Sequence, residues 1–454
     1  MNPQTAERLA IWLDGTHVAD LLRDPRASHK PYGLQYTDET LERLDTGALC
    51  LSASLPVTRR LLVSKPKGGT NRTGPVDHWV AALLPEGEAL AIMENNAGLA
   101  RGDTFGFLRR FGHDCAGAVA FLPPGDRPDT TSMPAPEPVD LADAISQLPY
   151  YPIAGYEHDD GLSLGGFQAK LLLTEAPDGD TTRWIRPRLN APSTHIAKPD
   201  PIEGTTVGLV ISEAIAMHVL RAAGIDTAVT DLIDVDGRPV LLATRFDRAR
   251  DAASPGTPIT RLHQESLCQA VGVAPTERFQ RYGGPTYAQL AELLLSHGLD
   301  PDAEQRALLA QITATVALGN TDAHGVNYGL LLRDGNARLT PAYDVANTTA
   351  FLPRRSEGHR IAIFPDDKDR LLYVGRRSLI AEATRWGLPR KDAASVVETT
   401  IAKLVEALPQ AVEAHSGWLD SSDQQRRDNA QRAVEHMTNH TQRLASTSED
   451  PPKP

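Results

Sequence analysis

Strand-like runs fill the middle of this chain, and helical patterns dominate from about Arg261 onward. One convincing helix, Val207–Ala223, interrupts the strands; its apolar residues recur near the helical period, and Gly224 follows as a C-cap. The expected strands cover residues 170–174, 195–198, 230–235 and 239–246. This order predicts an α+β fold in which a strand-rich lobe with one helix precedes a mainly helical lobe.

A further segment precedes the strand-rich lobe. Residues 8–22 are expected to form a β-hairpin, because Asp14-Gly15 suits the positive φ angles of a two-residue turn. Six of the sixteen residues from Pro123 to Pro138 are proline, which is typical of a linker or a surface crossing. We therefore place the main sequence boundary in this proline-rich stretch.

A chain of 454 residues is too long for one ordinary core, so several folding units are expected. We predict an N-terminal α/β subdomain at residues 1–125 and a strand-rich lobe at 140–255. A helical lobe follows at 256–445, and a polar, proline-ended tail at 446–454 is predicted to be disordered.

The charge balance argues against direct binding to nucleic acid. Lys and Arg number 46 against 58 Asp and Glu, which gives a formal net charge of −12. An acidic chain without a concentrated basic stripe is poorly suited to grip DNA or an anionic membrane alone. A basic partner protein could still supply such contacts.

The three cysteines lie far apart at Cys50, Cys115 and Cys268, and none forms a CxxC pair. This pattern supports neither a disulfide framework nor a zinc site. We also find no basic region followed by an apolar stretch at the N-terminus, and no apolar run of membrane-spanning length. These observations predict a cytoplasmic protein with reduced thiols and no membrane partner.

The run Asn320-Thr321-Asp322-Ala323-His324-Gly325-Val326-Asn327 contains an acid and an amide five residues apart. Protein kinases place their catalytic Asp and a magnesium-binding Asn at that separation on one loop. A second acid, Asp344, follows the expected hairpin at 328–339, where a further magnesium ligand would be needed. Alternatively, Asn320 and Asp322 cap a helix and Asp344 belongs to a turn.

His324 lies between the candidate base and the candidate metal ligand. It could orient the loop or contact a phosphate, although a single histidine is more often a hydrogen-bonded structural residue. A transition-metal site is not supported, because no neighbouring group of His or Cys accompanies it.

The run Ser163-Leu164-Gly165-Gly166-Phe167-Gln168-Ala169-Lys170 precedes an expected strand. Paired glycines allow the backbone to approach phosphates closely and to direct N–H groups at them. The run matches neither GxGxxG nor GxxxxGK[ST], so a tight turn without a ligand is an equally open reading. Lys198, at the end of the strand 195–198, could pair with ATP phosphates and be held by Glu213 in the following helix.

Taken together, these segments resemble the HipA family of kinases, the toxin halves of bacterial toxin–antitoxin pairs. The resemblance covers roughly residues 8–400 and depends on several motifs in the same order. These are Leu83-Leu84-Pro85-Glu86-Gly87, Ser163 to Lys170, Thr194 to Lys198, Glu213 to Gly224, Arg245-Phe246-Asp247-Arg248, Arg261-Leu262-His263-Gln264-Glu265, Asn320 to Asn327 and Tyr343-Asp344-Val345.

The resemblance implies a two-lobed, protein-kinase-like fold and a role for each motif. Asp322 would be the catalytic base, Asn327 and Asp344 the Mg²⁺ ligands, and Ser163 a site of autophosphorylation that silences the enzyme. The residues implied in ATP binding are Gly165, Gly166, Phe167, Gln168, Ala169, Lys170, Lys198, Thr244, Arg245, Phe246, His324, Asn327, Tyr343 and Asp344. Two departures affect this assignment: Phe167 and Ala169 replace a small residue and an acid, and Thr244-Arg245 replaces a more acidic hinge.

The same resemblance implies a serine/threonine kinase that arrests growth by phosphorylating a translation component, such as an aminoacyl-tRNA synthetase. Its partners would be a protein substrate and a HipB-like antitoxin, and DNA would be reached only through that antitoxin. Two rival functions stay open: a kinase of small molecules, and a non-catalytic module that only holds an antitoxin. The target, the antitoxin and the oligomeric state are not determined by the sequence.

Overall fold

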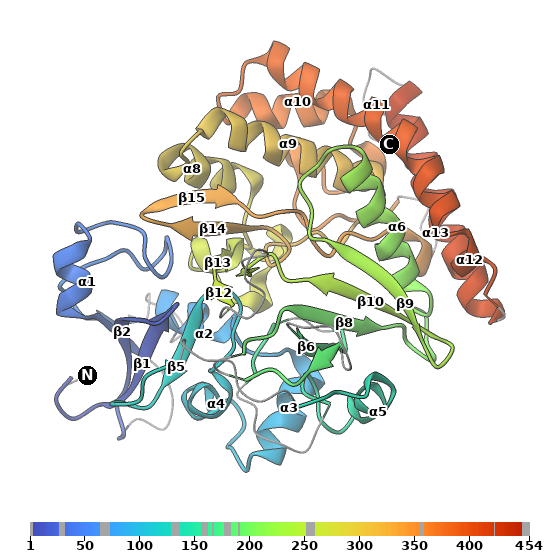
Figure 1. The fold of residues 1–454 in the computed structure, drawn as a ribbon. Helices are drawn as coiled ribbons and strands as arrows, with labels where there is room; N and C mark the ends of the chain where they lie inside the picture. The colour runs from blue at the N-terminus through green and yellow to red at the C-terminus, as the bar shows by residue number, and fades with distance from the viewer. Residues whose placement is uncertain are drawn as a thin grey trace. The chain divides into compact units, whose positions relative to one another are not determined.

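The computed structural model describes residues 3–26, 32–63, 73–128, 137–155, 162–165, 168–176, 183–188, 191–250, 259–353, 358–421 and 423–446. The chain forms two compact units (Figure 1). The first unit comprises Met1–Lys198, Thr244–Thr276 and Leu330–Asn336. The second unit comprises Pro199–Ala243, Glu277–Gly329 and Ala337–Pro454.

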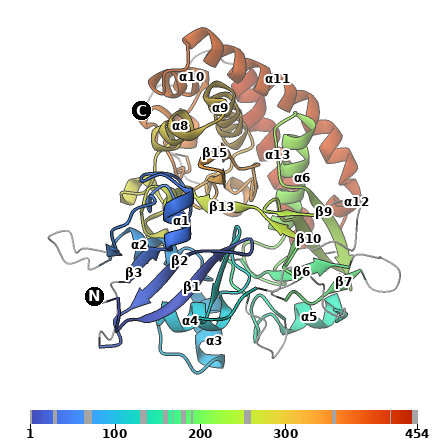
Figure 2. The same cartoon turned by 60° about the vertical axis from the view of Figure 1, so that its left-hand side comes forward.

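The first unit begins with an antiparallel sheet in the order β4-β3-β2-β1-β5 (Figure 2). The predicted hairpin is confirmed: Leu13 pairs with Thr16, and Asp14 and Gly15 between them have φ angles of +42° and +83°. The elements of this part are β1 Glu7–Leu13, β2 Thr16–Arg23, β3 Gly33–Tyr36, α1 Asp38–Arg43, β4 Leu62–Val63, α2 Pro75–Ala81, α3 Gly87–Asn96, α4 Thr104–Phe111 and β5 Val119–Leu122.

The remainder of the first unit contains a second antiparallel group, in which β6 pairs with both β7 and β8. The elements here are α5 Leu141–Gln147, β6 Leu171–Glu175, β7 Trp184–Ile185, β8 His195–Pro199, β11 Arg248–Ala249, β12 Thr260–Arg261, β13 His263–Ser266 and α7 Leu267–Ala270. The predicted strands at 170–174 and 195–198 are therefore confirmed to within a residue.

One hydrophobic core runs through the first unit. Trp79 and Phe121, whose ring centroids lie 6.1 Å apart, share this core with Leu162 and Leu172 from beyond the proline-rich stretch. Because burial of apolar surface holds both segments against the same core, the compact unit extends across the sequence boundary at 125–140. The predicted boundaries thus mark segments of the sequence, whereas each compact unit of the structure combines several separate stretches of the chain.

The second unit contains the predicted long helix and most of the remaining helices. α6 covers Leu209–Ala222 and is followed by Gly224 at φ +80°, as the C-cap signal predicted. The other elements are β9 Thr230–Val235, β10 Arg238–Thr244, α8 Tyr287–His297, α9 Pro301–Ala317, β15 Asn336–Leu339, α10 Arg376–Arg385, α11 Arg390–Ala414, α12 Ser416–Leu419 and α13 Gln424–Ser446. The strand β14 Gly329–Arg333 belongs, from its second residue on, to the first unit. In the second unit, α11 packs against α6, α9 and α13 (Figure 1).

Several predictions fall partly outside the described residues. Gly166 and Phe167 of the glycine run lie outside them, as do residues 129–136 of the expected linker. Of the tail predicted at 446–454, Ser446 is the last residue of α13, and the rest lies outside the described part. Within the described part, no helix is both long and apolar enough to cross a membrane.

Candidate active site

The loop that follows α9 carries the predicted base. The amide of Asp322 donates a 3.0 Å hydrogen bond to the side-chain oxygen of Asn320, which forms a local Asx turn. The amide of His324 then donates to Asp322 O, and the amide of Asn327 donates to His324 O, each over 2.8 Å. These short-range bonds hold Asp322 and Asn327 on one compact loop.

The predicted second metal ligand, Asp344, has a left-handed backbone with φ +58°. This conformation is uncommon for a residue with a side chain and is concentrated at turns and functional sites. The Asn327 amide nitrogen donates to Asp344 Oδ2 over 3.2 Å, and the Tyr343 hydroxyl donates to Val326 O over 2.7 Å. The structure therefore brings Asn327 and Asp344 together although seventeen residues separate them.

Two further side chains tie the two loops to each other. The Thr321 amide donates to Thr348 Oγ1 over 2.8 Å, next to Asp322 in the chain. Asn347, which is fully buried, donates from Nδ2 to Leu318 O over 2.8 Å. These bonds join the stretch before Asp322 to the stretch after Asp344. The loops that carry the two acids are therefore held to each other by hydrogen bonds.

Exposure separates the candidate reactive groups from their surroundings. Asp322 and Asp344 are exposed and Asn327 is partly exposed, whereas Thr321 and Ala323 beside the base are buried. Mg²⁺ is a hard cation that takes oxygen ligands, often one or two protein carboxylates together with substrate phosphates. Asn327 and Asp344 therefore fit a magnesium ion, and Asp322 is accessible to a substrate hydroxyl.

His324 is buried, and its ring meets Phe279 edge-on with the centroids 5.4 Å apart. Burial and, to a smaller extent, the positive charge of Arg278 together lower the pKa of His324 from 6.5 to about 4, against an opposing effect of Asp344. The ring is therefore neutral at pH 7. Its Nδ1 atom has no hydrogen-bond partner among the described residues, so a bound ligand could supply one.

The predicted phosphate loop lies in the first unit. Lys170 is buried, and its Nζ donates to Gly165 O over 2.6 Å, so the lysine holds the loop backbone. Ala169 is exposed, and the buried Nε2 of Gln168 has no partner in the part of the chain that the structure describes. An unpartnered buried donor in this loop fits the binding of an anionic phosphate. Lys198 is half-buried near the end of β8.

Ser163 is completely buried at the start of this loop. Its hydroxyl donates to Leu83 O over 2.6 Å, and its amide donates to Asp114 O over 3.1 Å. The hydroxyl is thus bonded to the Leu83-to-Gly87 motif and not to the glycines of the loop. In this arrangement the hydroxyl is inaccessible, and a phosphate cannot be added unless the segment moves.

The predicted hinge residue Arg245 makes its hydrogen bonds within the protein. The Arg245 side chain is buried and points into the protein, where it donates to Asp247, Ser193 Oγ and Cys115 O. Its backbone N–H donates to Thr194 O over 2.8 Å, so that group is already occupied. Thr244 and Phe246 on either side are half-buried.

A buried ionic cluster surrounds the Arg245 side chain, and sequence reasoning gave it no role. The Asp114 carboxylate is fully buried, accepts from Ser193 and lies 2.8 Å from Arg248 and 3.3 Å from Arg261. The three cluster arginines outweigh the cost of burial and hold the pKa of Asp114 well below its usual range. The RFDR and RLHQE motifs supply these arginines, so the motifs were visible but their shared partner was not.

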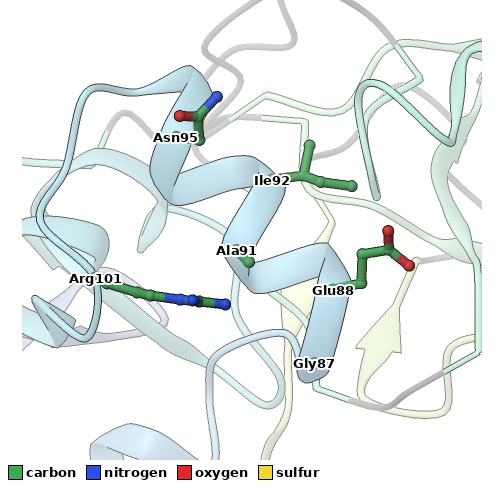
Figure 3. Close-up of a pocket in the computed structure, with 6 residues that line it drawn as sticks. All are labelled: Gly87, Glu88, Ala91, Ile92, Asn95 and Arg101. Carbon is green, nitrogen blue, oxygen red and sulfur yellow. The ribbon is translucent and has the colours of Figure 1, made fainter.

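A surface depression of about 580 Å³ lies along α3 in the first unit, lined by Gly87, Glu88, Ala91, Ile92, Asn95 and Arg101 (Figure 3). It contains one acidic and one basic side chain and none of the predicted site residues. We assign it no part in the chemistry.

Comparisons with known proteins identify the family of this chain. Residues 9–122 match the HipA N-terminal domain, and residues 162–408 match the HipA-like C-terminal domain. The chain belongs to the HipA family. A candidate kinase of Sinorhizobium fredii, Y4mE, is 30% identical over 425 residues, which are 90% of this chain and 91% of the relative.

HipA of Shewanella oneidensis extends the comparison, both by its sequence and by a solved structure. The serine/threonine-protein kinase toxin HipA is 26% identical over 359 residues, covering 76% of this chain and 78% of the toxin. A solved complex of HipA, HipB and operator DNA contains a chain with a TM-score of 0.75 and 22% identity, covering 96% of this chain and 97% of that one. The solved structure confirms the predicted HipA-like fold. The family models and the relatives named as kinases show that the chain is a HipA-family kinase.

Proposed function

We propose that this HipA-family protein transfers the terminal phosphate of ATP, with Mg²⁺, to a serine or threonine of another protein. One observation carries the proposal: Asn327 and Asp344 are hydrogen-bonded on loops tied to the exposed Asp322. This is the combination of one base and two oxygen ligands that phosphoryl transfer requires. The Shewanella relative named as a serine/threonine kinase supports the choice of acceptor.

In the proposed reaction, Asp322 accepts the proton of the substrate hydroxyl while the hydroxyl oxygen bonds to the γ-phosphorus of ATP. The bond between that phosphorus and the bridging oxygen breaks, and ADP leaves. Asn327 and Asp344 would hold Mg²⁺, which neutralises charge on the phosphate oxygens when it is bound. His324 offers a neutral ring nitrogen, and Lys170 and Lys198 offer cations for the phosphates.

The finer assignments follow from the family. We propose a translation component, such as an aminoacyl-tRNA synthetase, as the target, and Ser163 as a site of autophosphorylation. A HipB-like antitoxin is proposed as the neutralising partner, supported by the solved Shewanella complex of HipA, HipB and DNA. DNA would be contacted through that antitoxin and not by this chain.

The test is phosphate transfer by Asp322→Asn. The amide is isosteric with the carboxylate but cannot accept the hydroxyl proton, so transfer should fall by about 10²-fold or more while ATP binding persists. Labelled ATP with a lysate-derived protein mixture measures transfer, and calorimetry measures binding. Asp236→Asn, an exposed aspartate in the turn between β9 and β10, is the control. Wild-type transfer by Asp322→Asn would exclude the assigned base.

A further inference from the structure

α13, Gln424–Ser446, lies outside residues 162–408 that match the HipA-like C-terminal domain. It is nevertheless part of the folded core of the second unit, where it packs against α6, α9 and α11 (Figure 1). Ala430, Ala433, Met437 and Leu444 of this helix are fully buried. The buried side of α13 therefore contacts structure that holds the candidate active site.

The last turns of α13 approach the entrance to the Asp322 loop. Thr441 Oγ1 donates to Ala317 O, the last residue of α9, over 3.1 Å. Gly319 has φ +73°, and a β-carbon there would lie 2.6 Å from Asn347 Nδ2 and 3.0 Å from His440 Cδ2 of α13. A residue with a side chain would be strained at this position, so glycine permits the close approach of the helix.

The middle of α13 reaches the same loops through His436. Its Nδ1 lies 2.9 Å from Thr349 Oγ1, which donates to Asn347 Oδ1 over 3.1 Å. Asn347 Nδ2 in turn donates to Leu318 O. With the threonine proton directed at Asn347, His436 is the donor to Thr349. This relay connects α13 to the chain just after Asp344 and just before Asp322.

The start of α13 supports a third segment. Arg426 Nε donates to Asp200 Oδ2 over 2.9 Å, and the Asp200 carboxylate, which is fully buried, also accepts from Gly208 N at the start of α6. Asn429 Nδ2 donates to Val207 O over 2.9 Å. Asp200 stands two residues after Lys198 in the chain. Arg426 thus anchors the segment that leaves β8.

From these contacts we propose that α13 positions the catalytic machinery, with His436 as the positioning residue for the loops that carry Asp322 and Asp344. His436 acts through Thr349 and Asn347 and touches neither substrate nor metal. The effect on phosphate transfer depends on the proposed kinase function, whereas the effect on loop order does not. Loop order and phosphate transfer are therefore measured separately.

The first measurement is amide hydrogen exchange of the full-length protein without nucleotide. His436→Ala removes the partly buried hydrogen bond to Thr349, so exchange in residues 317–327 and 344–351 should accelerate about tenfold. His436→Asn, whose amide can occupy the Nδ1 position, should restore protection. The control Asn439→Ala changes an exposed residue of the same helix. Unchanged exchange at both loops in His436→Ala would overturn the proposal.

A second variant, Thr349→Val, breaks the same relay without altering α13. It keeps the test valid if His436→Ala fails to fold, because faster exchange should again be confined to the two loops. If the amides of residues 317–327 and 344–351 exchanged as slowly in Thr349→Val as in the wild type, the proposal would likewise be overturned.

The second measurement is the magnesium dependence of phosphate transfer. His436→Ala should lower kcat and raise the half-saturating magnesium concentration about tenfold, with little change in KM for ATP at saturating magnesium. Asn439→Ala should behave as wild type. If wild-type protein transfers no phosphate, the kinase proposal fails, and hydrogen exchange alone still decides the role of α13. If kcat, the half-saturating magnesium concentration and KM for ATP all changed by the same factor, the result would contradict the proposal that His436 positions the loop with the proposed metal ligands.

Discussion

At the scale of single residues, Asp344 combines an exposed carboxylate with a left-handed backbone and a hydrogen bond from Asn327. A strained conformation at an aspartate persists only when the surrounding contacts impose it. Val345, Ala346 and Asn347, which follow it, are all buried and supply such contacts. The carboxylate is thereby presented to solvent from a fixed backbone.

Asp344→Ala should weaken magnesium-dependent ATP binding about tenfold or more, because it removes one of the two proposed protein ligands of Mg²⁺. Calorimetric titration of ATP with and without Mg²⁺ measures the change. Asp236→Ala is a matched control, since Asp236 is also exposed and left-handed with φ +51°. Equal magnesium dependence in Asp344→Ala and wild type would remove Asp344 from the metal site.

Ser163 raises a different question, because its buried hydroxyl donates to Leu83 O. A phosphate there removes the donor and adds about −1.5 to −2 charge against a carbonyl oxygen, so the modified segment cannot keep this position. Incubation with Mg-ATP should add one phosphate that maps to Ser163 by mass spectrometry, and the product should bind ATP more weakly.

The controls for this prediction are two serine-to-alanine variants. Ser163→Ala should stay unmodified and bind ATP, whereas Ser146→Ala should be phosphorylated as wild type. Ser146 also donates to a backbone carbonyl but is exposed on α5. Phosphate found only at other residues, or normal ATP binding by the phosphorylated protein, would rule out self-inhibition at Ser163.

At the scale of elements, a buried acid joins the end of β13 to the loop before β4. Glu265 accepts from Ser52 Oγ over 2.5 Å and from Ala53 N over 3.0 Å. Burial raises the pKa of Glu265 from 4.5 to about 7, against the opposing effect of these two donors. The carboxyl is thus protonated in the folded protein over a pH range in which an unfolded chain would release the proton.

Because the folded pKa is the higher one, the folded state binds more protons between pH 4.5 and about 7. The free energy of unfolding should therefore fall as pH rises through this window, by up to about 3 kcal/mol. Glu265→Gln should remove this slope, since the amide keeps an acceptor for Ala53 N and carries no charge.

Denaturant unfolding of both proteins at pH 5 and pH 8 measures the difference. Glu88→Gln, at an exposed position of α3, is the control. A slope that is unchanged in Glu265→Gln would assign the pH dependence to other groups.

At the scale of the whole molecule, the net charge of −12 opposes approach to DNA phosphates. The isolated chain should therefore bind duplex DNA weakly and without sequence preference at physiological salt. Fluorescence anisotropy with two unrelated duplexes measures this, and a basic DNA-binding protein is the positive control. Tight binding to one duplex by the chain alone would contradict an antitoxin-mediated contact.

The sequence by itself determined the local structure of this protein. The Asp14-Gly15 turn, the strands near 170–174 and 195–198, and the helix closed by Gly224 follow from residue period and turn chemistry, which depend on near neighbours. The order of short motifs likewise identified the HipA family, because each motif is a run of neighbouring residues that can be read directly from the sequence.

Only the tertiary structure decided how distant segments support one another. It buried Ser163 under Leu83 O, turned the Arg245 side chain inward, and linked His436 through Thr349 and Asn347 to the loops of the candidate site. A sequence period predicts none of the long-range contacts among these, because Ser163 and Leu83, Arg245 and Cys115, and His436 and Thr349 each lie 80 or more positions apart in the chain. Burial then makes each bond necessary, since an unpaired polar group away from water is costly.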